Sequence, residues 1–113
     1  MPRYVGQRVP QIVVGGELAD DVLLDVREPR EYAAGHAREA RSIPQSDLEA
    51  HRFLLPMNRR LVVMSRHGER GADATVELRE MGFQAVNFDG GLEEWAAAGK
   101  PLVTDDGRPG RLA

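Results

Sequence analysis

The sequence predicts an α/β fold in which a mainly parallel central sheet of about five strands carries helices on both faces. Short apolar runs, typical of strands buried on both faces, alternate with short helical patterns along the 113 residues. The clearest transition follows residues 60–64, where an apolar run ends in a charged, glycine-containing loop and a helical pattern begins at once. In open sheets of this kind ligands bind beyond the carboxyl ends of the strands, which is where this loop falls.

The first half of the chain is expected to supply three strands and one short helix. Residues 9–14 form a short first strand, and residues 22–26 form an apolar run with one acid, typical of a central strand. Pro29 occupies a first-turn position of a helix that ends at Gly35. Residues 41–44 form a brief strand.

The next elements surround the loop. A helix is expected over residues 45–50, and residues 60–64 form the central strand. After the loop, Ala74, Leu78 and Met81 fall at positions i, i+4 and i+7, which makes one apolar stripe on a helix.

The last elements begin where that helix ends. Gly82 followed by Phe83 predicts a left-handed C-cap with its hydrophobic contact. Residues 85–88 form the last strand, and the helix after it carries Leu92 and Trp95. We expect Trp95 to pack in the core.

The bulk properties bound the function. We expect one domain over residues 1–103 and a C-terminal tail over 104–113, whose composition is that of a loop. A net charge of −3 offers no general attraction for nucleic acid or an anionic membrane. No apolar run approaches the roughly 20 residues that span a bilayer, and no apolar secretory segment follows Met1. A cytoplasmic location is therefore expected.

The chain contains no cysteine and only three scattered histidines. The absence of cysteine excludes disulfides, thiolate metal sites and thiol catalysis together. We therefore expect no metal site and no cofactor.

The candidate site is the loop Ser65-Arg66-His67-Gly68-Glu69-Arg70. A helix N-terminus offers unpaired N–H groups and the positive end of the helix dipole, so it attracts anions. The two arginines and the histidine strengthen this interpretation. The loop is therefore predicted to bind a small oxyanion.

Three separated segments together resemble the rhodanese-like domain family. They are residues 24–44 with Asp25-Val26-Arg27-Glu28-Pro29, the strand–loop–helix at 61–82, and residues 89–102 with Asp89-Gly90-Gly91-Leu92-Glu93-Glu94-Trp95. The resemblance implies a three-layer α/β fold and a sulfurtransferase-type loop. In active members a cysteine at the position of Ser65 carries a sulfane sulfur as a persulfide, and N–H groups matching residues 66–70 surround it.

The length of the loop, and the positions at which its residues differ from the common family pattern, define what this resemblance implies for function. Four residues separate Ser65 from Arg70, which resembles the sulfurtransferase loop, whereas related phosphatases have one residue more. Arg70 matches the loop-closing arginine of many members. Ser65 replaces the cysteine, His67 stands where a small hydroxyl residue is common, and Gly71 stands where serine or threonine is common. A hydroxyl cannot form a persulfide, so relay through Ser65 is chemically excluded.

The neighbouring charges have structural alternatives. Arg70 is expected either to bind an oxyanion or to pair with Glu69, Asp25 or Glu28 and hold the loop. Asp25 and Arg27 end a strand near the loop, where they are expected to form a structural charge network with a minor functional part. Arg66 is expected to face solvent.

Three functions remain to be compared. The leading hypothesis is a domain without sulfurtransferase activity that binds a thiosulfate- or sulfate-like oxyanion or a protein partner. The second is an active thiosulfate or persulfide sulfurtransferase whose cysteine was replaced by Ser65. The third is hydrolysis at Ser65, which is disfavoured because the His67 ring is expected to point outward and no Gly-x-Ser-x-Gly elbow surrounds the serine.

Overall fold

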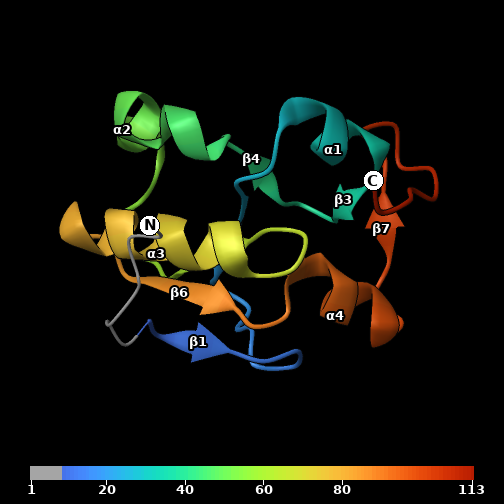
Figure 1. Cartoon of the computed structure of the whole chain (residues 1–113), viewed down its shortest axis with the longest axis horizontal. Coiled ribbons are helices and arrows are strands. Elements are labelled where there is room, and N and C mark those ends of the chain that lie inside the picture. Colours follow the sequence, from blue (N-terminus) through green and yellow to red (C-terminus); the bar gives the residue numbers. More distant parts are fainter. Residues whose placement is uncertain (1–8) are drawn as a thin grey trace.

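A parallel sheet of five strands forms the centre of the structure, a computed structural model that describes residues 9–113 (Figure 1). Its strand order is β1-β6-β5-β2-β4, and every neighbouring pair is parallel. The strands are β1 (Gln11–Ile12), β2 (Val22–Asp25), β4 (Arg41–Ser42), β5 (Leu61–Met64) and β6 (Ala85–Phe88). The predicted fold class is therefore confirmed, and β5 lies in the middle of the sheet.

The helices divide between the two faces of the sheet. They are α1 (Pro29–Ala34), α2 (Leu48–His51) between the 3-10 turns η1 (Gln45–Asp47) and η2 (Arg52–Leu54), α3 (Glu69–Glu80) and α4 (Gly91–Ala97). One apolar cluster packs α2 and α3 against the sheet, and a second packs α4 and the segment after α1 against the other face. Helices thus cover both faces.

Strand β5 explains why its sequence is apolar throughout. Leu61 and Val63 enter the first cluster, whereas Val62 and Met64 enter the second. Alternate side chains of a strand point to opposite faces, so a central strand with helices on both sides has no solvent-facing position. This packing fixes the end of β5, from which the candidate loop starts.

Most predicted elements are confirmed with modest changes in length. The first strand is only two residues long, and the helix expected over 45–50 is one α-turn flanked by 3-10 turns. Gly82 adopts φ of 98°, and the Phe83 N–H donates to the Leu78 carbonyl at 3.0 Å, which is the predicted left-handed cap.

Residues 85–88 form a strand as expected, but it is not the last one, so that part of the expectation is wrong. β7 (Leu102–Val103) pairs antiparallel with β3 (His36–Ala37) in a separate small sheet. Strands of two residues are too short to produce an alternating pattern, so the sequence carries no signal for them.

The segment predicted as a tail packs on the rest of the chain. The Gly110 N–H donates to the Leu102 carbonyl at 2.8 Å, and the Arg111 N–H donates to the Ala34 carbonyl at 2.9 Å. Leu112 packs against the second apolar cluster. Figure 1 shows this segment beside α1, β3 and β7.

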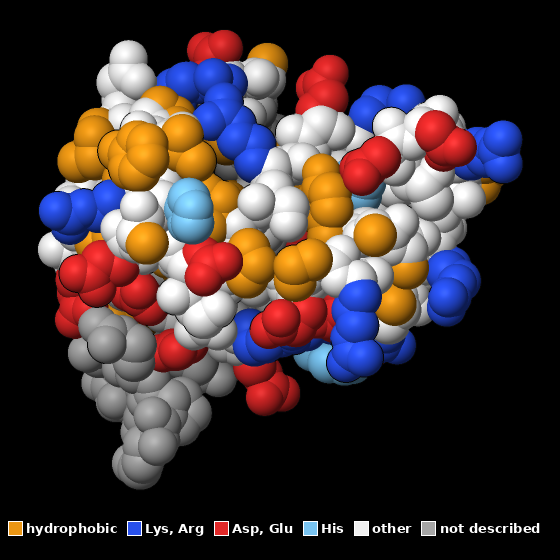
Figure 2. Space-filling view, turned by 90° about the horizontal axis from the view of Figure 1, so that it is seen from above, with side chains coloured by type: hydrophobic (Ala, Val, Ile, Leu, Met, Phe, Trp, Pro, Cys, Tyr) orange, Lys and Arg blue, Asp and Glu red, His pale blue; other side chains and the backbone are white. Residues whose placement is uncertain are grey.

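Two surface features complete the description. Among the described residues, no helix has the length and apolar character needed to cross a bilayer. Phe53, Leu54 and Met57 are strongly exposed although they are large and apolar. Figure 2 shows an apolar group over α2, at the left of the view.

Candidate functional site

Ser65 lies at the junction between β5 and the loop that leads to α3. Its side chain is buried, with 1% exposure. Its Oγ accepts hydrogen bonds from the backbone N–H groups of Gly68 at 3.1 Å and Gly71 at 3.0 Å. Gly68 is the N-cap of α3 with φ of 107°, which permits the turn that aims both N–H groups at Oγ. The serine therefore closes the loop into a ring.

Helix α4 holds the same loop from the other side. The Leu92 N–H donates to the Ser65 carbonyl at 2.8 Å, and the Glu93 N–H donates to the Arg66 carbonyl at 3.1 Å. Gly91 has φ of 65°, and a Cβ there would lie only 2.4 Å from the Ser65 carbonyl oxygen. Only glycine permits this approach, so Gly91 is what allows α4 to pack against the loop.

Several loop N–H groups remain for an external acceptor. Within residues 9–113, no protein acceptor takes the N–H groups of Arg66, His67, Glu69 or Arg70. Those of Glu69 and Arg70 belong to the first turn of α3, where no intrahelical partner exists. Since both bonds to Ser65 Oγ are accepted ones, its hydroxyl hydrogen is also left to donate. The loop is thus rich in donors.

Arg70 makes a two-pronged ion pair with Glu31 of α1. Its two terminal nitrogens lie 2.8 and 3.0 Å from the two carboxylate oxygens. The structural role expected for Arg70 is present, but the partner is none of the three acids expected. The hydrogen bonds from Arg70 lower the pKa of Glu31 from 4.5 to about 2. Sequence reasoning missed Glu31 because it lies 39 residues away along the chain.

Glu93 of α4 lies against the other two basic residues of the loop, Arg66 and His67. Its Oε1 lies 3.4 Å from Arg66 Nε and 3.1 Å from His67 Nδ1. Arg66 also donates to the carbonyl of Ala113. Arg66 is therefore more covered than expected, whereas His67 is exposed as expected.

Asp25 and Arg27 form a buried ion pair beneath the loop rather than part of its surface. Arg27 Nη2 lies 2.8 Å from Asp25 Oδ2 and 2.8 Å from the Gly35 carbonyl oxygen, and both side chains are almost fully buried. Arg27 Nη1 is a buried atom without a protein partner. The pair ties the end of β2 to the end of α1, which is the structural role expected for it.

Asn87 of β6 lies against the start of α3 and was not singled out from the sequence. Its Nδ2 donates to the Gly68 carbonyl at 3.1 Å and to Gln11 Oε1 at 2.9 Å. A Cβ on Gly71 would lie 2.4 Å from Asn87 Oδ1 and 3.1 Å from Ser65 Oγ. The Asn87 amide therefore fills the volume that a side chain at position 71 would need, and only glycine fits there.

No histidine is placed to activate Ser65. His36 Nδ1 contacts the Tyr32 carbonyl, and its ring stacks on Tyr32. His51 contacts the carbonyl of Asp47, and His67 contacts Glu93. A serine nucleophile needs a hydrogen-bonded base, so the geometry offers no support for hydrolysis at Ser65. Trp95 is buried with its ring edge on Phe88, as expected for a core residue.

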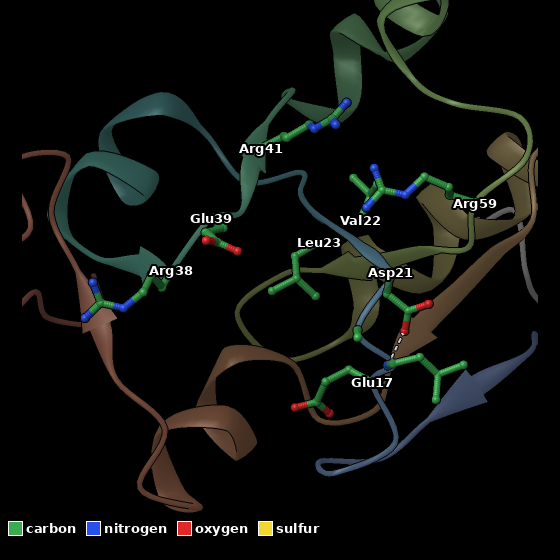
Figure 3. Close-up of a pocket in the computed structure, with 10 residues that line it drawn as sticks. Glu17, Asp21, Val22, Leu23, Arg38, Glu39, Arg41 and Arg59 are labelled. Atoms are coloured by element: carbon green, nitrogen blue, oxygen red, sulfur yellow. Dashed lines mark hydrogen bonds between the residues drawn. The ribbon is translucent and has the colours of Figure 1, made fainter.

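A hollow of about 370 Å³ lies at the edge of the sheet opposite the Ser65 loop (Figure 3). Its lining residues lie before or at the start of β2 and β4 and before β5, whereas the Ser65 loop follows β5. Its charges serve the fold: Asp21 binds Arg60 at 2.7 Å, Glu17 binds Lys100 at 2.6 Å, and Arg59 donates to the Asp20 carbonyl at 2.8 Å. This hollow is separate from the candidate site.

Fold and loop together define an α/β domain with a loop rich in backbone N–H donors at the carboxyl end of its central strand. The profile of the rhodanese-like domain family matches residues 14–98. The chain belongs to this family.

Individual relatives agree with the assignment. Over 89 residues, 78% of this chain and 83% of the relative, the chain is 32% identical to a protein named sulfurtransferase from Allochromatium vinosum. A crystal structure of a rhodanese-related protein from Thermoplasma volcanium superimposes with a TM-score of 0.79 at 29% identity, covering 85% of this chain and 99% of that one. A rhodanese-like domain protein from Staphylococcus aureus gives 0.72 at 25% identity, covering 77% and 91%.

We expect Gly71→Ala to lower the free energy of unfolding by about 1–3 kcal/mol, because the added methyl group displaces Asn87. Glycine to alanine inside a helix ordinarily stabilises by about 1 kcal/mol. Urea unfolding of Gly71→Ala, Asn87→Ala and the double variant measures the coupling. The double variant is expected to lose at least about 1 kcal/mol less than the sum of the single losses. Additive losses would show that the two residues do not compete for space.

The Glu31–Arg70 pair predicts a specific pH dependence. The pKa of Glu31 is lower in the folded protein (about 2) than its ordinary 4.5, so the pair stabilises the fold above pH 4.5, and this contribution disappears as the pH falls toward 2. Because the Arg70 side chain is 40% exposed, solvent screening limits the contribution to about 1 kcal/mol. The free energies of unfolding of wild type and Glu31→Gln, measured in urea, are expected to differ by this amount at pH 7 and to converge as the pH falls to about 2. A pH-independent difference contradicts the assignment.

Proposed function

We propose that this rhodanese-like domain binds a small oxyanion, such as sulfate or thiosulfate, in the loop of residues 65–70 and does not transfer sulfur through residue 65. The observation that carries the proposal is Ser65 itself, a hydroxyl in place of a thiol, within a loop whose backbone donors are preserved. A persulfide is a bond between two sulfur atoms, and residue 65 supplies only oxygen. The cradle remains without its nucleophile.

The backbone geometry supports anion binding at this position. The Gly68 and Gly71 N–H groups that bind Ser65 Oγ are ones that would stabilise a thiolate there, because hydrogen bonds to the charged form lower a thiol pKa. The remaining N–H groups of the loop then serve a ligand with several acceptor oxygens. Two loop donors, Arg66 and His67, and two donors of the first turn of α3, Glu69 and Arg70, are available for the several oxygens of a tetrahedral anion.

The side-chain charges support modest affinity. Glu31 and Glu93 each pair with a cationic residue of the loop, so the arginines contribute less field than their number implies. Affinity therefore rests mainly on the backbone, and it is expected in the millimolar range at low ionic strength.

A second candidate is sulfur transfer by a form of the chain with cysteine at position 65. The identity with a relative named sulfurtransferase favours it. This candidate requires that the natural gene encode cysteine at position 65 and that the serine be an engineered change. A serine codon at that position of the natural gene would exclude it.

A thiosulfate:cyanide assay compares wild type, Ser65→Cys and Ser65→Ala. Wild type and Ser65→Ala are expected to produce no thiocyanate above buffer, since neither carries a sulfur nucleophile. Turnover by Ser65→Cys would show that only the nucleophile is missing, and inactivity would show that the loop has diverged further. Wild-type turnover at rates typical of the family would overturn the proposal. A chromogenic ester panel on wild type and Ser65→Ala tests hydrolysis, and equal backgrounds would exclude it.

Anion binding is measured by titrating ¹⁵N-labelled protein with sodium sulfate and thiosulfate at low ionic strength. The amide signals of Arg66, His67, Glu69 and Arg70 are expected to shift most, because their N–H groups have no protein acceptor among the described residues and would hold the ligand. Glu93→Gln removes the acid paired with Arg66 and His67, so it should tighten binding by about 2–5-fold.

Glu94→Gln is the matched control, since Glu94 lies on the same helix and has no ion pair with the loop among the described residues. It should leave the affinity unchanged within about 1.5-fold at the same ionic strength. Absence of shifts at 66–70, or equal effects of the two variants, would count against anion binding there.

A further inference from the structure

Three large apolar side chains stand in solvent on one short segment. Phe53 is 78% exposed, Leu54 is 54% exposed and Met57 is 52% exposed. We call these three residues the α2 patch, because they follow α2 (Leu48–His51) directly in the chain. Beside them lies a hollow of about 390 Å³, whose lining includes Met81 and Phe83. Contiguous exposed apolar surface on a soluble protein marks an interaction site.

The fold itself does not require these side chains. Leu48 and Leu55 of the same segment are buried in the first apolar cluster and anchor it to α3. Phe53, Leu54 and Met57 are not part of that buried cluster. A polar residue at any of these three positions would cost little core contact, so their apolar character calls for a partner.

Charge is arranged asymmetrically around the patch. On one side a second hollow, which shares Arg52 and Met81 with the first, is lined by Glu49, Glu77 and Glu80. On the other side Arg41 reaches the patch, since its Nη1 donates to the Leu54 carbonyl at 3.3 Å. In Figure 2 basic side chains lie above the apolar group and acidic ones below it, with a further basic side chain at the left edge between the two.

We propose that the α2 patch binds the same patch of a second copy of this chain about a twofold axis. A twofold axis lying in the interface, perpendicular to the line from the acidic to the basic side, places the acids of each copy over the arginine of the other. Such an interface is self-complementary, as twofold symmetry requires. The apolar centre and the opposed charges then match at the same time.

The expected dimer is weak. A standard stable interface buries roughly 800 Å² on each partner, against a total surface of 6325 Å² here. Three side chains with their charged surroundings fall below that size, so a dissociation constant on the order of 10–100 µM is expected.

The patch is remote from the Ser65 loop. Glu80 and Met81 lie at the C-terminal end of the twelve-residue α3, whereas the loop leads into its N-terminal end. The length of α3 is about 18 Å at 1.5 Å per residue. Dimerisation therefore leaves the loop open and does not rest on the proposed function.

Sedimentation equilibrium between about 5 and 500 µM tests the dimer. The wild-type weight-average mass is expected to rise from one chain toward two over this range. Phe53→Asp should weaken the association at least tenfold, because it places a charge in the apolar centre of both copies. Leu18→Asp is the matched control, since Leu18 is 64% exposed but outside the patch, and it should associate like wild type. A wild-type mass of one chain at all concentrations, or Phe53→Asp and Leu18→Asp behaving alike, would overturn the proposal.

Charge reversal tests the twofold arrangement and distinguishes it from a different partner. Arg41→Glu and Glu49→Arg should each associate less than wild type, since each places like charges opposite one another. An equimolar mixture should recover the wild-type affinity, because each altered side then meets its complement. Circular dichroism confirms that each variant is folded. Failure of the mixture to associate better than either variant alone would overturn the proposed geometry.

Discussion

The hydrogen bonds that converge on Ser65 determine the geometry of the loop and of the two helices around it. Its Oγ accepts the N–H groups of Gly68 and Gly71, and its carbonyl accepts the N–H of Leu92. One residue thereby joins the end of β5 to the first turns of α3 and α4. Unpaired buried polar groups are costly, so the loop has little freedom while these bonds persist. The Ser65 hydroxyl accepts both N–H bonds that shape the loop, and as an oxygen group it cannot itself form a persulfide.

The acids around the loop explain how a site with two arginines and a histidine exists in a protein of net charge −3. Glu31 comes from α1 and Glu93 from α4, so each flanking helix brings one carboxylate to the loop. The positive charge of the two arginines is largely offset by these carboxylates, so the backbone N–H groups are the main donors left for a ligand. Any ligand selectivity at this position therefore depends more on shape and acceptor geometry than on charge.

The sequence was sufficient for the fold and for the position of the loop because both depend on local patterns. The apolar run at β5 and the stripe of α3 are visible in single windows of residues. The partners of the loop are not, since Glu31 lies 39 residues from Arg70 and Asn87 lies 19 residues from Gly68. No periodicity encodes which distant acid meets an arginine. Gly71 stands out in the sequence as an unusual residue, whereas the Asn87 amide that leaves no room for a side chain there is visible only in three dimensions. The short pairing of β3 with β7 falls below the length at which a pattern exists.

The elements around the site are joined by a closed series of hydrogen bonds and strand pairings. The loop binds α4, the Trp95 indole of α4 binds the Pro101 carbonyl, and β7 that follows pairs with β3. His36 of β3 contacts the Tyr32 carbonyl in α1, and Glu31 of α1 returns to Arg70 at the loop. Opening one link releases its neighbours on both sides, so slow amide exchange should be lost around the circuit as one cooperative unit rather than element by element. Amides in segments distant in sequence would then exchange with a single rate of local unfolding, set by the least stable contact in this series.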